Sequence, residues 1–286
     1  MNVMLLAAGE GTRLRPHTLL RPKPAMPFLN VPLAAYPLGF LENLKIDRLV
    51  VNTFHLPTKI VDLFIQMDHG ARRLHFSHEI NQIMGSGGGL SMARDYFRGN
   101  GDLIMMNSDE VILPFEPDVM AKAIEFHKSN NAFCTLLTMD HHEVGSKFGG
   151  VWLDEAERVR GFGKTAPDAT GKKAEHFIGV QILSEEVFDF LPQGHASNIL
   201  YDAVTQAMQK GRLVQRLKID CHWFETGNAV DFLGATEQVL HLLSSADSNE
   251  YSRKYLNRVL KRFSKDTPLL SASDDGCVLK SPTSVI

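Results

Sequence analysis

Short, nearly continuous apolar runs alternate with amphipathic segments through residues 1–115. The apolar runs predict strands that are buried on both faces, and they cover residues 2–8, 48–53, 73–77 and 102–107. In the segments between them apolar residues recur at helical spacing, over residues 33–44, 59–67 and 89–97. This alternation predicts right-handed crossover units in a Rossmann-like, doubly wound α/β sheet. In such a sheet ligands bind at the carboxyl ends of the strands.

The pattern of apolar positions changes after Phe115. It predicts a helix over 118–128 and then strands over 133–139, 150–154, 158–162 and 176–183. A helix over 199–209, a strand over 213–219 and a helix over 229–243 follow, and Asn228 is a suitable N-cap for the last of these. We interpret residues 116–243 as an extension of the sheet that carries a lid or a second binding half. The whole is then a mixed sheet between two helical layers, a three-layer sandwich.

Beyond Ser244 the chain becomes polar and then resumes as a basic amphipathic stretch over residues 251–263. We expect this tail to lie outside the core. The predicted organisation is therefore one domain over residues 1–243, with halves at 1–115 and 116–243, and a C-terminal helix and polar tail over 244–286.

The composition is that of a globular protein, because 44% of the 286 residues are hydrophobic and 22% are charged. A net charge of -3 argues against a surface that neutralises a nucleic-acid backbone. The three cysteines are far apart and odd in number, so neither a disulfide framework nor a structural zinc site is expected. The apolar start is too short for a signal peptide, and no apolar run reaches the ~20 residues that span a bilayer. We expect a cytoplasmic protein with no membrane or nucleic-acid partner.

The first candidate for chemistry is the turn that follows the first predicted strand. Gly9 and Gly11 let backbone N–H groups approach phosphate oxygens, because neither residue carries a Cβ atom. Thr12 adds a hydroxyl donor, and Arg13 adds a planar guanidinium suited to bidentate phosphate binding. Lys23 lies between two prolines that hold the backbone extended and give its ammonium group a defined direction. These residues predict a clamp for a polyphosphate.

A purely structural turn is the alternative reading of the two glycines. The segment matches neither the dinucleotide fingerprint, because position 14 is leucine, nor a Walker A loop, because no Gly-Lys-Ser/Thr follows.

The sequence G-E-G-T-R-L-R-P at residues 9–16, followed by P-K-P at 22–24, resembles the signature of the nucleoside-diphosphate-sugar pyrophosphorylases. These enzymes are also called sugar-1-phosphate nucleotidyltransferases. The chain is similar to the mannose-1-phosphate guanylyltransferases and the N-acetylmuramate-1-phosphate uridylyltransferases among them, and the resemblance covers residues 1–243. It implies the fold of that family. It also implies that the loop from Ala8 to Arg13 holds the triphosphate of an NTP and that Lys23 contacts phosphates near the reacting centre.

A second motif, G-S-G-G-G-L, begins at Gly85 and opens a predicted helix. Consecutive small residues leave a flat backbone surface on which a planar base can lie. The motif resembles the family's G-T-A-G-G segment, which implies that Gly85 and Gly88 line the base pocket. A flexible turn is the alternative interpretation.

Two acidic motifs are candidates for a magnesium site. Asp109 ends the segment Asn-Ser-Asp after an apolar strand, where a carboxylate can bind Mg²⁺. The family reads N-G-D here and uses the Asp as a metal ligand, so Ser108 replaces a glycine. Glu225 in W-F-E-T-G resembles the family's second metal-binding Asp, although its extra methylene moves the carboxylate outward. We expect the neighbouring Glu110 to face solvent or a helix end.

The resemblance also implies acceptor contacts in the second half of the chain. Gly150, Lys164 and Gly179 fall where family members bind the sugar and its phosphate. Gly163 stands where the family has a glutamate. We expect His141 and His142 to point apart, as neighbours on a strand do, and so not to share a metal.

The sequence therefore predicts a nucleotidyltransferase that joins an NTP and a sugar 1-phosphate to give an NDP-sugar and pyrophosphate. A sugar-phosphate oxygen attacks the α-phosphorus in line, Asp109 and Glu225 hold Mg²⁺, Arg13 and Lys23 neutralise the leaving pyrophosphate, and Lys164 holds the acceptor. The catalytic residues are then Arg13, Lys23 and Asp109.

Two other functions stay open at this stage. One is a regulatory subunit that binds nucleotide without turnover, which the replacements at Ser108, Gly163 and Glu225 motivate. The other is a nucleotidyltransferase for a non-sugar phosphate such as phosphocholine. The sequence identifies neither the nucleobase nor the sugar, and a homo-oligomer is compatible with it. Residues 276–279 and 284–286 faintly resemble the start of a left-handed β-helix that some family members append, which implies a longer native chain.

Overall fold

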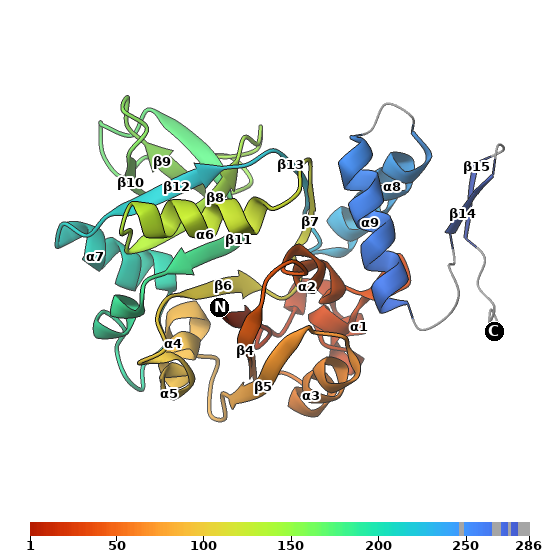
Figure 1. The fold of residues 1–286 in the computed structure, drawn as a ribbon, viewed down its shortest axis with the longest axis horizontal. Helices are drawn as coiled ribbons and strands as arrows, with labels where there is room; N and C mark the ends of the chain where they lie inside the picture. Colours follow the sequence, from red (N-terminus) through yellow and green to blue (C-terminus); the bar gives the residue numbers. More distant parts are fainter. Residues whose placement is uncertain (246–248, 265–269, 274–275, 280–286) are drawn as a thin grey trace.

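A nine-stranded mixed sheet forms the centre of the protein (Figure 1). The computed structural model describes residues 1–245, 249–264, 270–273 and 276–279. The strands of the central sheet are β1 (Asn2–Leu6), β4 (Ile46–Thr53), β5 (Ala71–His78), β6 (Leu103–Asn107), β8 (Cys134–Met139), β9 (Gly150–Leu153), β10 (Val159–Gly163), β11 (Lys173–Leu183) and β12 (Val214–Lys218).

The first half of the sheet is parallel and the second half is mainly antiparallel. The strand order is β10-β9-β11-β6-β1-β4-β5, and β8 pairs with both β11 and β12. β1 runs parallel to β4 and β6, and β4 runs parallel to β5. β11 runs antiparallel to β6 and so joins the second half to the first. The predicted doubly wound mixed sheet is confirmed, because parallel strands buried on both faces are read easily from continuous apolar runs.

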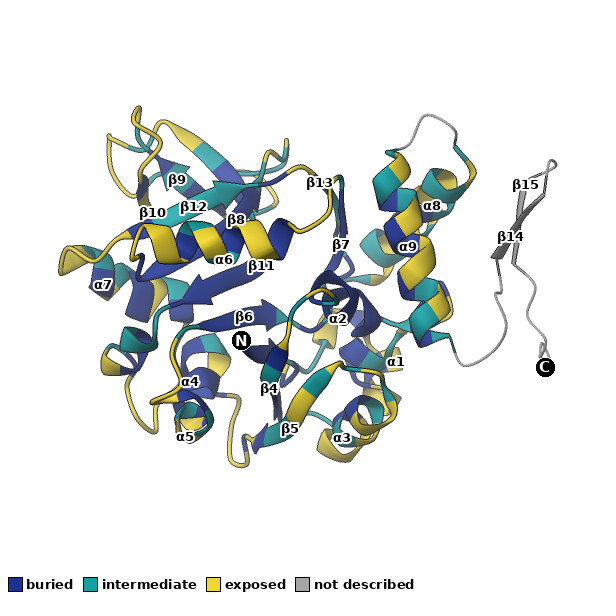
Figure 2. Ribbon diagram, in the orientation of Figure 1, coloured by how far each residue is buried: buried dark blue, intermediate teal, exposed yellow. Residues whose placement is uncertain are grey.

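Two apolar cores lie on opposite faces of the sheet and give the three layers that were predicted. Along β1, Val3 and Leu5 belong to one core and Met4 belongs to the other, because successive strand side chains point to opposite faces. Figure 2 shows the buried strands between helices whose outer surfaces are exposed. Helices that supply the first core are α2 (Ala35–Phe40), α3 (Pro57–Gln66), α6 (Val119–Ser129), α8 (Ala229–Ser244) and α9 (Glu250–Phe263). Those that supply the second are α4 (Gly85–Met92), α5 (Arg94–Phe97), η3 (Glu185–Asp189), η4 (Ile199–Val204) and α7 (Thr205–Gln209).

Several predicted helices differ from the observed ones in their ends. The helix expected over 89–97 is two helices, α4 and α5, which meet at Ala93. The helix expected over 199–209 begins as the π-helical segment η4 and continues as α7. Asn228 caps α8 as predicted, since its side chain accepts a hydrogen bond from the backbone N–H of Asp231 at 3.0 Å.

A second, two-stranded sheet joins segments that lie far apart in the sequence. β7 (Val111–Pro114) pairs antiparallel with β13 (Cys221–Phe224), with Val111 opposite Phe224. This pairing places the residues just before Val111 beside those just after Phe224. The two acidic motifs are thereby brought together.

The C-terminal helix α9 packs into the core, contrary to the expectation that the chain beyond Ser244 lies outside it. Leu256 and Val259 are buried, and the Tyr255 hydroxyl donates to the carbonyl of Tyr36 at 3.3 Å. The hydroxyl of Ser252 donates to the carbonyl of Pro114 at 2.7 Å. The basic face of α9 was visible in the sequence, but its apolar face finds a partner, α2, that only the fold supplies.

The remaining elements are short. They are η1 (Thr12–Leu14), α1 (His17–Leu20), η2 (Lys23–Ala25), β2 (Pro27–Phe28), β3 (Val31–Pro32), β14 (Leu270–Ser273) and β15 (Gly276–Leu279). β14 pairs antiparallel with β15. The expected resemblance to a β-helix at 284–286 lies outside the described residues. None of the helices in the described part of the chain combines the length and apolarity needed to cross a membrane.

Candidate functional site

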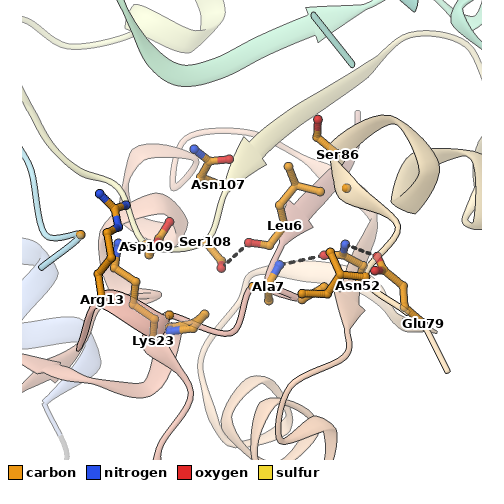
Figure 3. Close-up of a pocket in the computed structure, with 17 residues that line it drawn as sticks. Leu6, Ala7, Arg13, Lys23, Asn52, Glu79, Ser86, Asn107, Ser108 and Asp109 are labelled. Atoms are coloured by element: carbon orange, nitrogen blue, oxygen red, sulfur yellow. Dashed lines mark hydrogen bonds and ion pairs between the residues drawn. The ribbon is translucent and has the colours of Figure 1, made fainter. Parts of the chain in front are cut away.

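A cavity of about 360 Å³ opens at the carboxyl ends of β1 and β6 (Figure 3). This is the edge of a doubly wound sheet at which ligands are expected. The residues that line it come from the end of β1 and the glycine turn, the P-K-P segment, the ends of β4 and β5, the start of the G-S-G-G-G-L motif and the two acidic motifs: Leu6, Ala7, Ala8, Gly9, Gly11, Arg13, Lys23, Pro24, Asn52, Glu79, Ile83, Gly85, Ser86, Asn107, Ser108, Asp109 and Gly227. We call it the first cavity.

The charged end of the first cavity is built from Arg13, Lys23 and Asp109, which lie together in Figure 3. The ammonium group of Lys23 lies 2.6 Å from Oδ2 of Asp109. Gly11 has a left-handed backbone with φ +61°, and a Cβ there would lie 2.9 Å from Thr18 Cγ2. Glycine is therefore required at this turn on two grounds, conformation and space. Thr12 is exposed and does not line the first cavity.

The two acidic motifs meet beside Arg13. The hydroxyl of Thr226 donates to the backbone carbonyl of Asp109 at 3.3 Å, which ties the W-F-E-T-G segment to the end of β6. A Cβ at Gly227 would contact Oε1 of Glu225 and would lie 2.7 Å from Nη2 of Arg13. The segments that carry Asp109 and Glu225 thus lie side by side, although Glu225 itself does not line the first cavity, and a shared metal ion stays a prediction.

The opposite end of the first cavity contains a hydrogen-bonded pair that the sequence did not indicate. Asn52, at the end of β4, accepts from the backbone N–H of Ala7 at 2.7 Å and donates to Oε1 of Glu79 at 2.7 Å. Oε2 of Glu79 accepts from the backbone N–H of Met84 at 2.7 Å. Burial raises the pKa of the Glu79 carboxyl, while these two hydrogen bonds oppose that rise. No motif links two residues that are 27 positions apart, so only the fold shows this pair.

The glycines of α4 allow close packing on two sides: a Cβ at Gly89 would lie 2.8 Å from both Asn52 Nδ2 and Glu79 Oε1, and the other glycines meet the chain near Ser197. Gly85 has φ +68° and lines the cavity, and a Cβ there would lie 2.6 Å from the carbonyl oxygen of Ser197. Gly88 is buried, and a Cβ on it would lie 2.7 Å from the carbonyl oxygen of His195. Gly88 thus packs against the chain at 195–199 and does not line the first cavity.

Ser108, which stands where the resemblance has a glycine, turns its hydroxyl into the fold. Its Oγ donates to the carbonyl of Leu6 at 2.6 Å, and its backbone N–H donates to the same oxygen (Figure 3). The side chain therefore joins the ends of β1 and β6.

Glu110 points inward, contrary to the expectation that it faces solvent or a helix end. Its carboxylate accepts from Asn107 Nδ2 and from Trp223 Nε1, each at 2.7 Å. The reason is the pairing of β7 with β13, which puts Trp223 above it. Burial, and then the negative charge of Asp109, raise the pKa of Glu110 to about 7.

A second cavity of about 350 Å³ adjoins the first, and both are lined by Leu6, Ser86 and Asn107. Its other lining residues come from β6, β11 and η4: Met105, Met106, Phe177, Gly179, Gln181, Asn198, Ile199, Leu200 and Tyr201. The sequence indicated only Gly179 among these, and its backbone has φ +78° with Glu110 against the position of a Cβ.

Two of the residues predicted to bind the acceptor line neither cavity. Gly150 is buried in β9, where a Cβ would lie 2.6 Å from Val144 Cγ1. Lys164 follows β10 and is exposed, and its role stays a prediction.

An aromatic cluster lies beside Glu110 and is formed by Trp223 of β13 together with Phe148, His141 and His176. The ring centroid of His176 lies 4.1 Å from that of Trp223 and 5.1 Å from that of Phe148. His141 and His142 are stacked with ring centroids 4.8 Å apart, contrary to the expectation that they point apart, because they follow β8 in a turn. Within the described residues no group of three or more His, Cys, Asp or Glu side chains could hold a metal ion.

His176 should make the protein less stable as the pH falls from about 6.5 to 4. Burial, and then repulsion from His141, lower its pKa to about 4, and neither ring nitrogen has a protein hydrogen-bond partner in the described structure. Above pH 6.5 the ring is neutral in both states. Below it the unfolded chain binds a proton that the folded one does not, which costs about 3 kcal/mol once the pH reaches 4.

Urea unfolding between pH 4 and 7 measures this effect as the difference between the native chain and His176→Phe. That difference should shrink by most of the 3 kcal/mol toward low pH. The exposed His195 provides a matched control, because His195→Gln should leave the pH dependence as it is. A pH-independent difference for His176→Phe would contradict the prediction.

Comparison with known proteins matches residues 2–241 to the family described as "Nucleotidyl transferase". The UTP–glucose-1-phosphate uridylyltransferase of Synechocystis sp. is 25% identical over 249 residues, which is 84% of this chain and 63% of that protein. The mannose-1-phosphate guanylyltransferase of Mycobacterium tuberculosis is 26% identical over 237 residues, 82% of this chain and 63% of that protein. The chain thus spans less than two thirds of the length of these relatives.

The fold is also found among solved structures. A UDP-glucose pyrophosphorylase from Acinetobacter baumanii superimposes with a TM-score of 0.70 at 15% identity, covering 91% of this chain and 98% of that one. This likeness supports the arrangement of the strands and helices described above.

Proposed function

The chain belongs to the nucleotidyl transferase family, and on this premise we propose that it joins a nucleoside triphosphate and a sugar 1-phosphate to give an NDP-sugar and pyrophosphate. The observation that carries the proposal is the first cavity. A glycine turn, the Arg13 guanidinium, the Lys23 ammonium group and the Asp109 carboxylate line it at the end of a parallel sheet, and the segment that carries Glu225 borders it at Gly227.

The chemistry of the reaction explains why charged groups are what the site needs. A sugar-phosphate oxygen attacks the α-phosphorus of the nucleotide and the bond to pyrophosphate breaks. The attacking phosphate is already anionic near pH 7, so no strong general base is required. The barrier lies in bringing two polyanions together and stabilising charge on the transferring group. Arg13 and Lys23 neutralise the leaving pyrophosphate.

We propose one orientation for the nucleotide in the first cavity. Its triphosphate lies toward Arg13 and Lys23, where the backbone N–H groups of the glycine turn are also available. Its base lies toward Gly85 and the hydrogen-bonded pair of Asn52 and Glu79, since each Glu79 oxygen keeps a lone pair for the edge of a base.

Asp109 and Glu225 are the residues that would hold Mg²⁺. The donor set fits, because magnesium binds through one or two carboxylates and takes its other ligands from phosphates and water. The segments that carry the two carboxylates are tied together by Thr226, and no group of three or more His, Cys, Asp or Glu side chains in the described residues could hold a metal ion, so phosphate oxygens and water would supply the other ligands. When bound, the ion would neutralise charge on the α-phosphate in the transition state.

We propose that the sugar of the acceptor binds in the second cavity. It adjoins the first cavity at Leu6, Ser86 and Asn107, so a group bound there lies next to the triphosphate. In this proposal Lys164 binds the phosphate of the acceptor, and Gly150 and Gly179 shape the half of the protein, residues 116–243, that binds the acceptor.

A matrix of NTPs against sugar 1-phosphates, read out by pyrophosphate release, tests the function directly. Release with one or a few pairs is the expected result. Calorimetric nucleotide binding without release for any sugar phosphate would favour the regulatory subunit, and release with phosphocholine alone would favour the non-sugar acceptor.

Glu225→Asp should retain activity, whereas Glu225→Ala should lose most of it. The shorter side chain still presents a hard oxygen ligand to the ion, and alanine presents none. Steady-state pyrophosphate release at several Mg²⁺ concentrations measures both variants. Equal activity in the two would deny Glu225 a ligand role.

A further inference from the structure

The second cavity contains a buried polar atom for which the fold supplies no partner. Gln181 lies on β11 with 2% of its surface exposed. Its Nε2 donates to Met105 Sδ at 3.5 Å, and no protein group of the described chain hydrogen-bonds its Oε1. A buried amide oxygen without a hydrogen bond costs about 1–3 kcal/mol, so a protein seldom keeps one unless a ligand supplies the donor. If the amide were turned over so that its nitrogen and oxygen exchanged places, one of the two atoms would still have no hydrogen-bond partner, and the other would contact only the thioether sulfur of Met105.

The two cavities differ in charge. The first is lined by Arg13, Lys23, Glu79 and Asp109. The second has no Asp, Glu, Lys, Arg or His among its described lining residues, and its walls are largely apolar. A carboxylate or an ammonium group enclosed there would have no opposite charge to pair with. A neutral ring with apolar faces and hydroxyl groups at its edge matches such walls.

We infer that Gln181 determines acceptor specificity by accepting a hydrogen bond from one hydroxyl group of a neutral sugar. This inference rests on the proposed function and on the second cavity as the place of the sugar. A site that pairs a buried polar group with a substrate hydroxyl rejects the analogue that lacks it, because the protein group is then left unpaired. Three other polar side chains that line this cavity already have protein partners: Ser86 accepts from the backbone N–H of Ile199, Asn107 donates to Glu110, and Asn198 accepts from the backbone N–H groups of Leu200 and Tyr201. The side chain of Tyr201 is exposed, unlike that of Gln181.

The test starts from the acceptor that the wild-type protein uses best. Its 2-, 3-, 4- and 6-deoxy 1-phosphates are compared with the parent in kcat/KM. One deoxy analogue should lose about 10²-fold or more, on the scale expected when a buried polar group is left unpaired. The analogues of that sugar with a carboxylate or a free amino group in place of the C6 hydroxyl should be similarly poor.

Gln181→Met keeps the length of the side chain and removes the amide. In this variant kcat/KM for the parent sugar should fall to that for the poor deoxy analogue, so that the two values differ by less than about threefold. KM for the NTP should stay unchanged, because the nucleotide lies in the first cavity. Gln209→Leu, on the exposed face of α7, provides the matched glutamine control and should behave as wild type.

Three outcomes overturn the inference while the proposed function stands. In the first, the wild-type protein has a kcat/KM for every deoxy analogue within tenfold of that for the parent sugar. In the second, the wild-type protein uses the charged analogues as well as the parent, and in the third, Gln181→Met still loses as much kcat/KM on the deoxy analogue as the wild-type protein does. The first two outcomes are measured on the wild-type protein, so the inference can still be tested if Gln181→Met does not fold. Failure of the proposed function would look different, since the wild-type protein would then release no pyrophosphate with any sugar phosphate.

Discussion

Replacing Lys23 by alanine should lower kcat for pyrophosphate release by about 10²-fold or more, the scale of losing one preorganised electrostatic stabiliser. Lys23 is fixed between Pro22 and Pro24, and its ammonium group is placed at the charged end of the first cavity. The developing charge on pyrophosphate is largest in the transition state, so the loss should fall on kcat. Steady-state kinetics with saturating NTP measures it. Lys128→Ala, at an exposed position of α6, is the matched control and should be near wild type.

The ion pair between Lys23 and Asp109 adds a second consequence to this variant. At 2.6 Å the ammonium group occupies the carboxylate that is proposed to hold the metal ion. Without nucleotide, Lys23 and a divalent cation therefore compete for Asp109. Lys23→Ala should bind Mn²⁺ more tightly than wild type in the nucleotide-free state, measured by electron paramagnetic resonance, even as turnover falls. Near-normal kcat in Lys23→Ala would remove the residue from the mechanism.

The parts of the site that could be predicted from sequence are those whose chemistry is local. Gly11, Arg13 and Lys23 lie within fifteen residues, and the turn, the planar cation and the proline-flanked lysine are each recognisable from residue type. β1 and β6 were also predictable, because strands buried on both faces read as unbroken apolar runs. Their carboxyl ends then give the place of the first cavity.

The parts that could not be predicted depend on contacts between distant segments. Glu110 points inward because β13, which lies more than a hundred residues later in the sequence, pairs with β7 and places Trp223 where it donates a hydrogen bond to the Glu110 carboxylate. Asn52 and Glu79 meet because β4 and β5 are adjacent and parallel, which fixes their register but leaves no local motif. Gln181 interrupts the apolar run at the end of β11, from Phe177 to Leu183, and the sequence pattern does not distinguish a polar core residue from one that faces a ligand.

Replacing Asp109 by alanine should lower magnesium-dependent pyrophosphate release by about 10³-fold or more, equal to a loss of about 4 kcal/mol of transition-state stabilisation. The carboxylate follows β6 at the carboxyl edge of the sheet, and Thr226 holds its backbone next to the segment that carries Glu225. Alanine removes the ligand and leaves Lys23 without its partner. Asp62→Ala, at an exposed position of α3, is the matched control.

Chelation separates loss of the ion from any other effect of removing Asp109. If the carboxylate acts through the metal, the wild-type protein in excess EDTA and Asp109→Ala in Mg²⁺ should show the same residual rate, and EDTA should slow Asp109→Ala no further. Asp109→Asn keeps the shape of the side chain and one weaker oxygen ligand, so it should regain part of the rate as the Mg²⁺ concentration is raised, whereas Asp109→Ala should not. An unaffected rate in Asp109→Ala would show that residues other than Asp109 hold the metal ion. A variant rate that stays well above the chelated wild-type rate would show that the ion still binds, with Asp109 acting only to orient Lys23.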